Sequence, residues 1–565
     1  MKLRQILALV LALVMALSLV ACGNNAPATE TPNGDTPAET PTSAYPGTAA
    51  AGEITVDLGS EPEDLNTITE TYNYCYTLTR HYMENLLMLD ENANPVPGVA
   101  EEMPTISEDG LTYTFKLRQG MKWTNGEPVT AHDFIFGWTK LIDPEVASNY
   151  AYFGYQLFKN GEKFYNGECG IEEVGFKAID DYTIEVVLEN PTAYATYMFT
   201  FGNFAPVNEK FYNEVGAENY MTEAENFCTN GAYKVTEWVH ESKFVIEKNP
   251  DYYRADEVSL NKINFLMIAA SDAKLNSFKA GECDVIGVTG AQAKQLREEG
   301  AEVFSVADNS EFHVLFNCED EMLSNKNLRK AFDLAYSRQA LIDAILQNDS
   351  MPATSFTANG VNGFDGTSFA AAVEAKYGKL NAGDAQVELA NQYLDTALSE
   401  LGVTKEEVGA HITMNCGDSD TAVNQAAFFQ EQFRVNLGIE IQVKSMTTKA
   451  QAAERDAGNY DLDVTGWGPD YNDPMTFLDM WVTDGGNNSC NWSNARYDEL
   501  INMCKSETDL AKRQEYFLEC EKILNDECPI SCIYWRVKNY IKSDKITGGY
   551  VYNSWLEDYR FTTIK

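Results

Sequence analysis

The chain has 565 residues, of which 44% are hydrophobic and 12% aromatic, so it can form two or three domains with apolar cores. Its 85 acidic and 42 basic residues give a formal charge of −43. This charge argues against nucleic-acid binding, because phosphate contact needs a basic surface. It is most simply a solvated acidic surface that prevents association, and a monomer is therefore expected.

The first 22 residues have the features of a secretory signal peptide. Lys2 and Arg4 precede an apolar run over 6–21 that is interrupted only by Ser18 and is too short to span a bilayer. This segment ends in Leu-Val-Ala-Cys at 19–22, which resembles the bacterial lipobox. In a lipobox the thiolate of the cysteine takes a diacylglyceryl group. We expect lipidation at Cys22 and an extracytoplasmic protein anchored on the outer face of the cytoplasmic membrane.

A segment with almost no large apolar residue follows this motif. Residues 23–52 are rich in proline and threonine and cannot bury enough surface to offset the entropy cost of ordering. They are expected to form a disordered leash between the anchor and the folded part of the chain.

Alternating and helical patterns occur in the rest of the chain. Period-two or strand-like runs predict strands over 54–58, 111–117, 182–188, 243–247 and 440–443. Apolar residues near helical spacing predict helices over 327–347, 384–401 and 510–525, with Asp384 as the cap of the second helix and Gly402 at its end. This mixture predicts α/β lobes.

The composition gives little support for an enzyme or a metal site. Eleven scattered cysteines remain beside Cys22 and are expected to be free buried thiols, although Cys528 and Cys532 are close enough in sequence to pair. The five histidines lack zinc-ligand spacing. Asp461 and Asp463 share one face of a probable strand, but pairs of acids arise often by chance among 85 acidic residues and do not indicate a glycosidase. No nucleophile elbow, P-loop or His-Glu-x-x-His motif is present in the sequence. No catalytic activity, cofactor or metal is predicted.

Two loop-rich segments are less generic. Residues 120–134 join an Asn125-Gly126 turn to a helix start at Thr130. Residues 466–478 read Gly-Trp-Gly-Pro-Asp-Tyr-Asn-Asp-Pro-Met-Thr-Phe-Leu and place Asp470 beside an indole and a phenol. A loop after a strand is where an α/β lobe presents ligand contacts, although a structural loop is an equal alternative.

With these segments, the chain resembles the extracytoplasmic solute-binding proteins (family 5) of ABC importers, and most closely their oligopeptide-binding branch. Further blocks that carry the resemblance are Pro-Gly-Val-Ala-Glu at 97–101, Asn-Gly-Ala-Tyr-Lys-Val at 230–235, Glu-Lys-Asn-Pro-Asp-Tyr-Tyr at 247–253 and Phe-Lys-Ala-Gly-Glu-Cys-Asp at 278–284. The resemblance covers nearly all of 54–565. It implies an α/β, two-lobe periplasmic-binding-protein-like fold (type II, cluster C) with an additional N-terminal domain and a two-strand hinge.

The resemblance also implies a division of the chain into domains. The first lobe is expected to comprise 53–83, 209–309 and 536–565, the additional domain 84–208, and the second lobe 310–535. The discontinuous first lobe follows from the family and not from any periodicity.

The implied function is a receptor that holds an oligopeptide between closing lobes and delivers it to the transmembrane subunits of an ABC permease. Asp470 resembles the acid that receives the peptide α-ammonium group, and its neighbours resemble wall contacts. Tyr150 resembles an aromatic lining residue, with a core tyrosine as the alternative, and Arg455 a basic site residue, with a solvent-facing arginine as the alternative. The expected peptide-binding residues are Asp470, Trp467, Gly466, Tyr150, Arg455 and Tyr471.

Some positions depart from the branch. Residues 285–289 are mostly apolar where polar and aromatic groups are usual, and Thr448 stands where tryptophan is frequent. Peptide length and side-chain preference therefore stay open. Alternatives are the same fold carrying a nickel chelate, haem, an opine or an oligosaccharide, or a receptor that senses peptide pheromones.

Overall fold

The computed structural model describes residues 51–71, 73–91, 93–192, 194–364, 366–507, 509–549, 551–552 and 557–565. The predicted signal segment, Cys22 and all but the last two residues of the predicted leash lie outside the described residues. No helix within the described ranges is long and apolar enough to cross a membrane.

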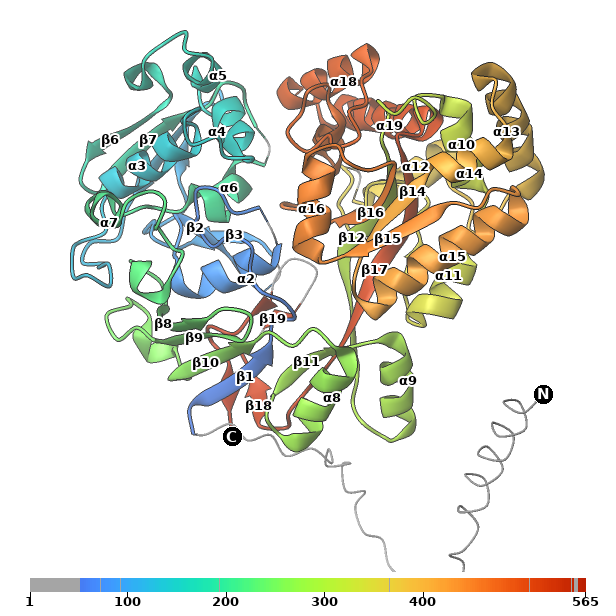
Figure 1. Cartoon of the computed structure of the whole chain (residues 1–565). Coiled ribbons are helices and arrows are strands. Elements are labelled where there is room, and N and C mark those ends of the chain that lie inside the picture. Colours follow the sequence, from blue (N-terminus) through green and yellow to red (C-terminus); the bar gives the residue numbers. More distant parts are fainter. Residues whose placement is uncertain are drawn as a thin grey trace, which may run out of the picture. The chain divides into compact units, whose positions relative to one another are not determined.

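The largest feature is an 11-stranded sheet that collects strands from most of the chain (Figure 1). Its hydrogen-bonded order is β15 (Gln442–Met446), β14 (Thr413–Gly417), β16 (Leu462–Trp467), β12 (Phe304–Phe316), β17 (Ile530–Lys542), β11 (Val285–Val288), β1 (Glu53–Asp57), β10 (Lys262–Leu266), β9 (Lys243–Lys248) and β8 (Tyr233–Val239), with β13 (Met351–Pro352) paired to β17.

Two 13-residue strands at the centre join the two halves of this sheet. β12 and β17 are antiparallel, and their register runs from Phe304 opposite Tyr540 to Leu315 opposite Ile530, with an irregularity between Ala307 and Glu311. Residues 539–542 at the end of β17 pair with β11. Residues 311–316, at the opposite end of the β12–β17 pair, join β12 to β16. A bulge of this kind bends a strand pair locally, so these strands are suited to act as a two-strand connection between lobes.

A separate four-stranded sheet is formed between residues 105 and 187. Its order is β4 (Thr105–Ile106), β5 (Thr112–Lys116), β7 (Thr183–Val187) and β6 (Phe176–Asp180), and a hairpin of β2 (Leu87–Leu89) and β3 (Pro95–Pro97) precedes it in sequence. Trp138, on α3 (Ala131–Leu141), is fully buried and packs on an aromatic cluster that includes Phe158, Phe176 and Phe199. The helix begins where the sequence predicts, because the Thr130 amide donates to the Asp133 carboxylate at 2.7 Å.

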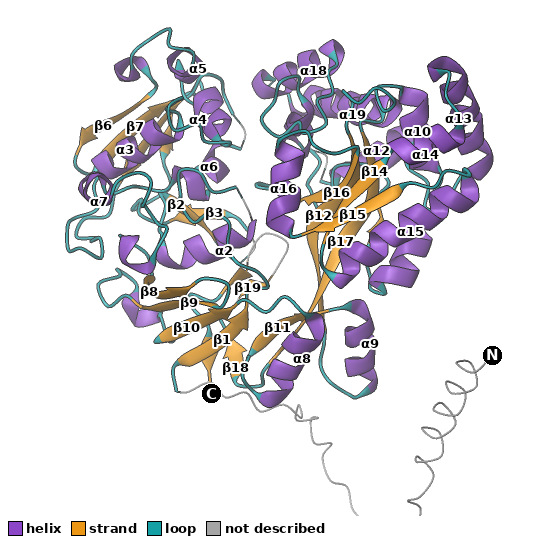
Figure 2. Cartoon of the chain, viewed as in Figure 1, coloured by secondary structure: helices purple, strands orange, loops and turns teal. Residues whose placement is uncertain are grey.

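Helices pack around these sheets (Figure 2). In the N-terminal half they are α2 (Asn73–Tyr82), α4 (Ala151–Leu157), α5 (Gly161–Tyr165), α6 (Ala195–Met198), α7 (Glu209–Val215), α8 (Ser271–Ala280) and α9 (Gly290–Glu298). In the C-terminal half they are α10 (Lys326–Leu334), α11 (Arg338–Leu341), the π-helix η5 (Ile342–Leu346), α12 (Phe369–Tyr377), α13 (Val387–Leu401), α14 (Lys405–His411), α15 (Asp420–Asn436), α16 (Thr448–Asp456), α17 (Met475–Leu478), α18 (Ala495–Ser506) and α19 (Leu510–Glu527).

Short elements complete the described chain. They are the 3₁₀ turns η1 (Ile171–Glu173), η2 (Gly202–Phe204), η3 (Ala224–Asn226), η4 (Ala255–Glu257) and η6 (Asp479–Trp481), and the strand pairs β18 (Ile546–Gly548) with β21 (Thr563–Ile564) and β19 (Val551–Tyr552) with β20 (Glu557–Asp558).

The predicted strands over 54–58, 111–117, 182–188 and 243–247 are confirmed to within two residues, whereas that over 440–443 begins two residues late, at Gln442. The single helix predicted over 327–347 is wrong. It divides into α10, α11 and η5, because the Ser337 hydroxyl accepts a hydrogen bond from the Ala340 amide and starts a new helix. Asp384 is also wrong as a cap, since α13 begins at Val387, while Gly402 ends that helix in the left-handed region as predicted.

All eleven cysteines of the described residues are free, and nine of them are buried. Cys528 and Cys532 both belong to this buried set, so the pairing that their spacing allows is not formed. Free buried thiols behave as small apolar side chains here.

Candidate functional site

A cavity of about 720 Å³ lies against the strands of the C-terminal half. Its wall is built from parts of β12, β14, β16 and α16 and from the loop over 485–491, and the N-terminal part of the chain contributes Thr71, Asn149 and Tyr150. This volume falls within the range of cavities that enclose small ligands. Six glycines occur in the lining, namely Gly417 and Gly466 on strands and Gly458, Gly468, Gly485 and Gly486 outside them.

Asp470 enters this cavity from the loop that follows β16. The loop is held by Thr476, whose hydroxyl accepts the Asp470 amide at 2.9 Å and whose carbonyl accepts the Trp467 indole N–H at 2.8 Å. Further along, the Asp473 carboxylate forms a buried bidentate pair with Arg513, at 2.6 and 3.0 Å. Both anchors fix the backbone on either side of Asp470, so its carboxyl group is positioned before any ligand arrives.

The carboxyl group of Asp470 is electrostatically uncompensated. Burial raises its pKa well above the usual range of an aspartate, and repulsion from Asp479 adds to the rise. Loss of solvation likewise raises the pKa of Asp479 to about 7. The Thr476 hydroxyl, 3.5 Å from Oδ2, opposes the rise, and within the described residues no lysine, arginine or histidine forms an ion pair with Asp470. Such a site favours an incoming cation.

Arg455 lines the same cavity from α16 and is largely covered, with 17% of its side chain exposed. It is not the solvent-facing arginine of the alternative hypothesis, because its Nη1 atom lies 3.1 Å from the Asp463 carboxylate on β16. Gln451 donates a second hydrogen bond to Asp463. The positive charge of Arg455 at the cavity wall is therefore already matched by a buried carboxylate.

Close packing explains why residue 466 is glycine. A Cβ atom at Gly466 would lie 2.9 Å from the Glu311 carbonyl oxygen and 3.0 Å from the ring of Phe312, both on the neighbouring strand. The indole of Trp467 extends the cavity wall beyond this contact.

The two predicted tyrosines lie in different environments. Tyr150 lines the cavity, although only 1% of it is exposed, and packs on Phe153 and Phe201 with ring centroids 4.8 and 5.7 Å apart. Tyr471 is not part of the lining. Its ring stacks on Tyr194 at 4.6 Å, within an aromatic contact between its loop and the N-terminal part of the chain.

The structure thus brings Asp470, Trp467, Gly466, Tyr150 and Arg455 together around one cavity. Thr448, where the sequence departs from the branch, lines it as well.

Sequence reasoning missed a buried acid–base pair, Glu311 and His313, of which His313 lines the cavity. His313 lies on β12 and its Nδ1 is 2.7 Å from Oε2 of Glu311, with both side chains at most 1% exposed. The signal was present, because residues two apart on a strand share a face. Glu311 and His313 alternate with Phe312 and Val314 near the end of β12. Arg536, on β17, was missed too; it lines the cavity and pairs with Asp308 at 2.6 Å.

Residues with metal-ligating side chains gather elsewhere. Asp320, His411 and Asp461 converge at a point outside the cavity lining.

Comparisons with known proteins identify the family and the fold to which this chain is similar. The family described as bacterial extracellular solute-binding proteins, family 5, matches residues 94–489. The oligopeptide-binding protein OppA of Bacillus subtilis is 31% identical over 503 residues, covering 88% of this chain and 89% of OppA. Listeria monocytogenes OppA bound to peptide has a TM-score of 0.84 at 31% identity, covering 91% of this chain and 99% of that structure.

A substrate-binding domain of an oligopeptide ABC transporter from Bacillus anthracis has a TM-score of 0.85 at 30% identity, covering 91% and 99% of the two chains. These likenesses confirm the two-lobe type II fold that the sequence resemblance implied.

Proposed function

Because the chain belongs to the bacterial extracellular solute-binding proteins of family 5, we propose that it binds oligopeptides in the cavity around Asp470 and delivers them to an ABC import permease. The protein acts by binding and not by catalysis. Relatives that are described as oligopeptide-binding support the ligand class, and the substrate-binding domain of an oligopeptide ABC transporter supports the import context.

The observation that carries the proposal is the uncompensated carboxyl group of Asp470. A peptide α-ammonium group supplies the missing positive charge, and a charge-assisted hydrogen bond of this kind is roughly twice as strong as a neutral one. Arg455, already paired with Asp463, is suited to a supporting contact with a ligand carboxylate. The charges therefore favour a ligand whose cationic end faces Asp470.

The four lining glycines outside the strands, Gly458, Gly468, Gly485 and Gly486, support main-chain recognition. Exposed backbone groups can pair with an extended peptide as an added strand does, which gives affinity without reading the side chains. Tyr150 and Trp467 supply apolar wall, and Tyr471 supports the loop from behind through its contact with Tyr194.

Closure of the lobes about β12 and β17 completes the proposal. The cavity draws its lining from both halves of the chain, so a bending motion of these strands opens and closes it. In the cell the protein is held on the outer face of the cytoplasmic membrane by lipid on Cys22 and works as a monomer. The leash over 23–52 keeps it near the permease and raises its effective concentration there.

Substitution of Asp470 by asparagine tests the assignment. The variant should lose most of its affinity for a peptide with a free amino terminus and little for the acetylated peptide, because only the first carries the ammonium group. The measurement is calorimetric titration of both peptides into both proteins. Equal losses for the two peptides would contradict the role of Asp470.

Native mass spectrometry of the purified protein tests the ligand class separately. A series of peptide masses released from the protein is expected, whereas a single discrete non-peptide mass would overturn the oligopeptide assignment and leave the family unchanged.

A further inference from the structure

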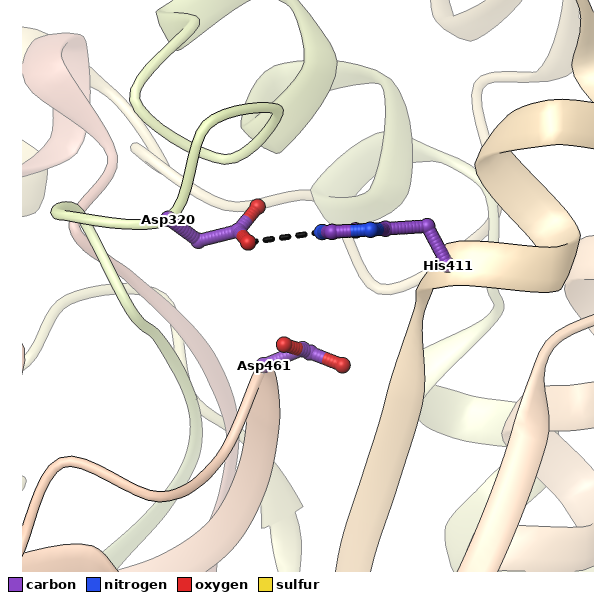
Figure 3. A group of neighbouring side chains, drawn as sticks. All are labelled: Asp320, His411 and Asp461. Atoms are coloured by element: carbon purple, nitrogen blue, oxygen red, sulfur yellow. Dashed lines mark hydrogen bonds and ion pairs between the residues drawn. The ribbon is translucent and has the colours of Figure 1, made fainter.

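Three potential metal ligands from separate parts of the chain meet at one edge of the large sheet (Figure 3). His411 is the last residue of α14 and lies just before β14, Asp461 directly precedes β16, and Asp320 follows β12. β14 and β16 are parallel, so their first residues are neighbours, and antiparallel β12 brings its last residues to the same edge. One ligand atom from each residue lies within 4.8 Å of the other two.

Both carboxylates are anchored by backbone amides. Oδ1 of Asp320 accepts the amides of Met322 and Leu323, each at 2.9 Å, which leaves Oδ2 directed at His411. Oδ2 of Asp461 accepts the Thr413 amide at 2.8 Å. Outer-shell hydrogen bonds of this kind fix ligand orientation at metal sites.

The imidazole of His411 is oriented by neighbouring carboxylates. Its Nε2 atom lies 2.7 Å from Oδ2 of Asp320, while Nδ1 is 3.9 Å from the carboxylate of Glu321. A ligating histidine commonly turns its second ring nitrogen to a carboxylate, which leaves the other nitrogen for the metal. The position between Nε2 and Oδ2 is therefore the place where a cation would replace a proton.

We propose that Asp320, His411 and Asp461 form a binding site for a divalent transition metal, with zinc as the preferred ion. One imidazole and two carboxylates match the nitrogen and oxygen ligands that zinc accepts, and the imidazole disfavours calcium and magnesium. The two carboxylates carry two negative charges, which a divalent ion balances. The side chain of Asp320 is 11% exposed and that of His411 is 29% exposed, so water can complete the coordination sphere.

This site lies outside the proposed ligand cavity, whose lining includes none of the three residues. Bound metal would join the segments next to β12, β14 and β16, the strands that also carry much of the cavity wall. Its expected effect is therefore to stabilise the C-terminal half of the fold without contacting the peptide. Histidine spacing did not predict it, because ligands from three distant segments leave no local pattern.

Isothermal titration of Zn²⁺ into the chelator-treated, untagged protein tests the proposal. One equivalent should bind, and zinc should raise the midpoint of thermal unfolding. His411→Ala and Asp461→Asn should each weaken binding by at least the ~10–100-fold that loss of an outer-shell partner costs. Asparagine at 461 keeps a side-chain oxygen for the Thr413 amide, so this variant removes the charge with little change in structure.

Two control variants distinguish this site from other zinc ligands. His132→Ala removes an exposed histidine that lies 3.4 Å from Asp181, and Cys318→Ser removes a partly exposed thiol close in sequence to Asp320. Both should bind zinc as the unmodified protein does. The proposal is overturned if the unmodified protein binds no zinc, if His411→Ala and Asp461→Asn bind it unchanged, or if Cys318→Ser alone abolishes binding.

Discussion

Acidification should weaken the binding of a peptide with a free amino terminus, because the ligand needs Asp470 in its charged form. In the unliganded protein, burial and the neighbouring Asp479 raise the pKa of Asp470, so a proton occupies the carboxyl group as the pH falls. An ammonium group stabilises the carboxylate and displaces this proton. Affinity should therefore rise with pH up to the pKa of Asp470 in the unliganded protein and then become constant.

The size of the effect follows from one displaced proton. Each pH unit below that pKa costs a factor of ten in affinity, about 1.4 kcal/mol, so a fall of two units costs up to ~100-fold. The peptide amine does not contribute over pH 5 to 7, since an α-amino group titrates near ~7.7–8.0. Removal of the repulsion with Asp479→Asn should lower the pKa of Asp470 and move the transition to lower pH.

Calorimetry at pH 5, 6 and 7, in pairs of buffers with different ionisation enthalpies, measures the affinity and the number of protons released together. Peptide binding to the unmodified protein should release up to one proton at the lower pH values. The Asp470→Asn variant should release none from residue 470, because it lacks the carboxyl group. The acetylated peptide serves as the matched ligand control. Equal affinity at pH 5 and pH 7, without proton release, would refute the reasoning.

Two further predictions concern the folded structure. Arg513→Met leaves the buried Asp473 carboxylate without its partner and should lower the free energy of unfolding by ~3–5 kcal/mol in denaturant titrations. The double variant with Asp473→Leu should lose less than the sum of the single changes, and strict additivity would contradict coupling of the pair. A thiol reagent should modify Cys169 and Cys318 before the nine buried cysteines of the described residues; uniform reactivity in the native protein would contradict this.

Local pattern predicted the strands well, because alternation over 111–117 and 182–188 reflects a sheet with one covered face. Local pattern gave a wrong helix boundary where a polar side chain, that of Ser337, starts a new helix within a continuous apolar pattern. Helical spacing persists from Leu328 to Ile345, yet the chain starts a new helix after Ser337. The Ser337 hydroxyl also donates to Asp384 at 3.3 Å, a tertiary contact that sequence spacing cannot reveal.

The candidate site was predictable where its residues are consecutive. Gly466 and Trp467 end β16 and Asp470 lies in the loop that follows, and loops at strand ends commonly present ligand contacts. Partners from distant segments were not predictable. The pairing of Arg536 with Asp308 depends on the register of β12 against β17, which is a property of the folded sheet.

A comparison with the buried acids shows why Asp470, which is partly exposed at the cavity wall, is informative. Five aspartates with at most 8% of their side chains exposed each face an arginine: Asp308, Asp333, Asp463, Asp473 and Asp558. Glu521 lacks such a partner but accepts the amides of Phe356 and Thr357. Asp470 has neither kind of compensation within the described residues beyond a hydroxyl at 3.5 Å. Among the described residues Glu70 likewise accepts a side-chain hydrogen bond only from a hydroxyl, that of Thr79 at 2.9 Å, but it is fully buried and does not line the cavity. Since a desolvated carboxylate is costly without a partner, the lack of one at the wall of a cavity is best explained if the ligand brings the cation.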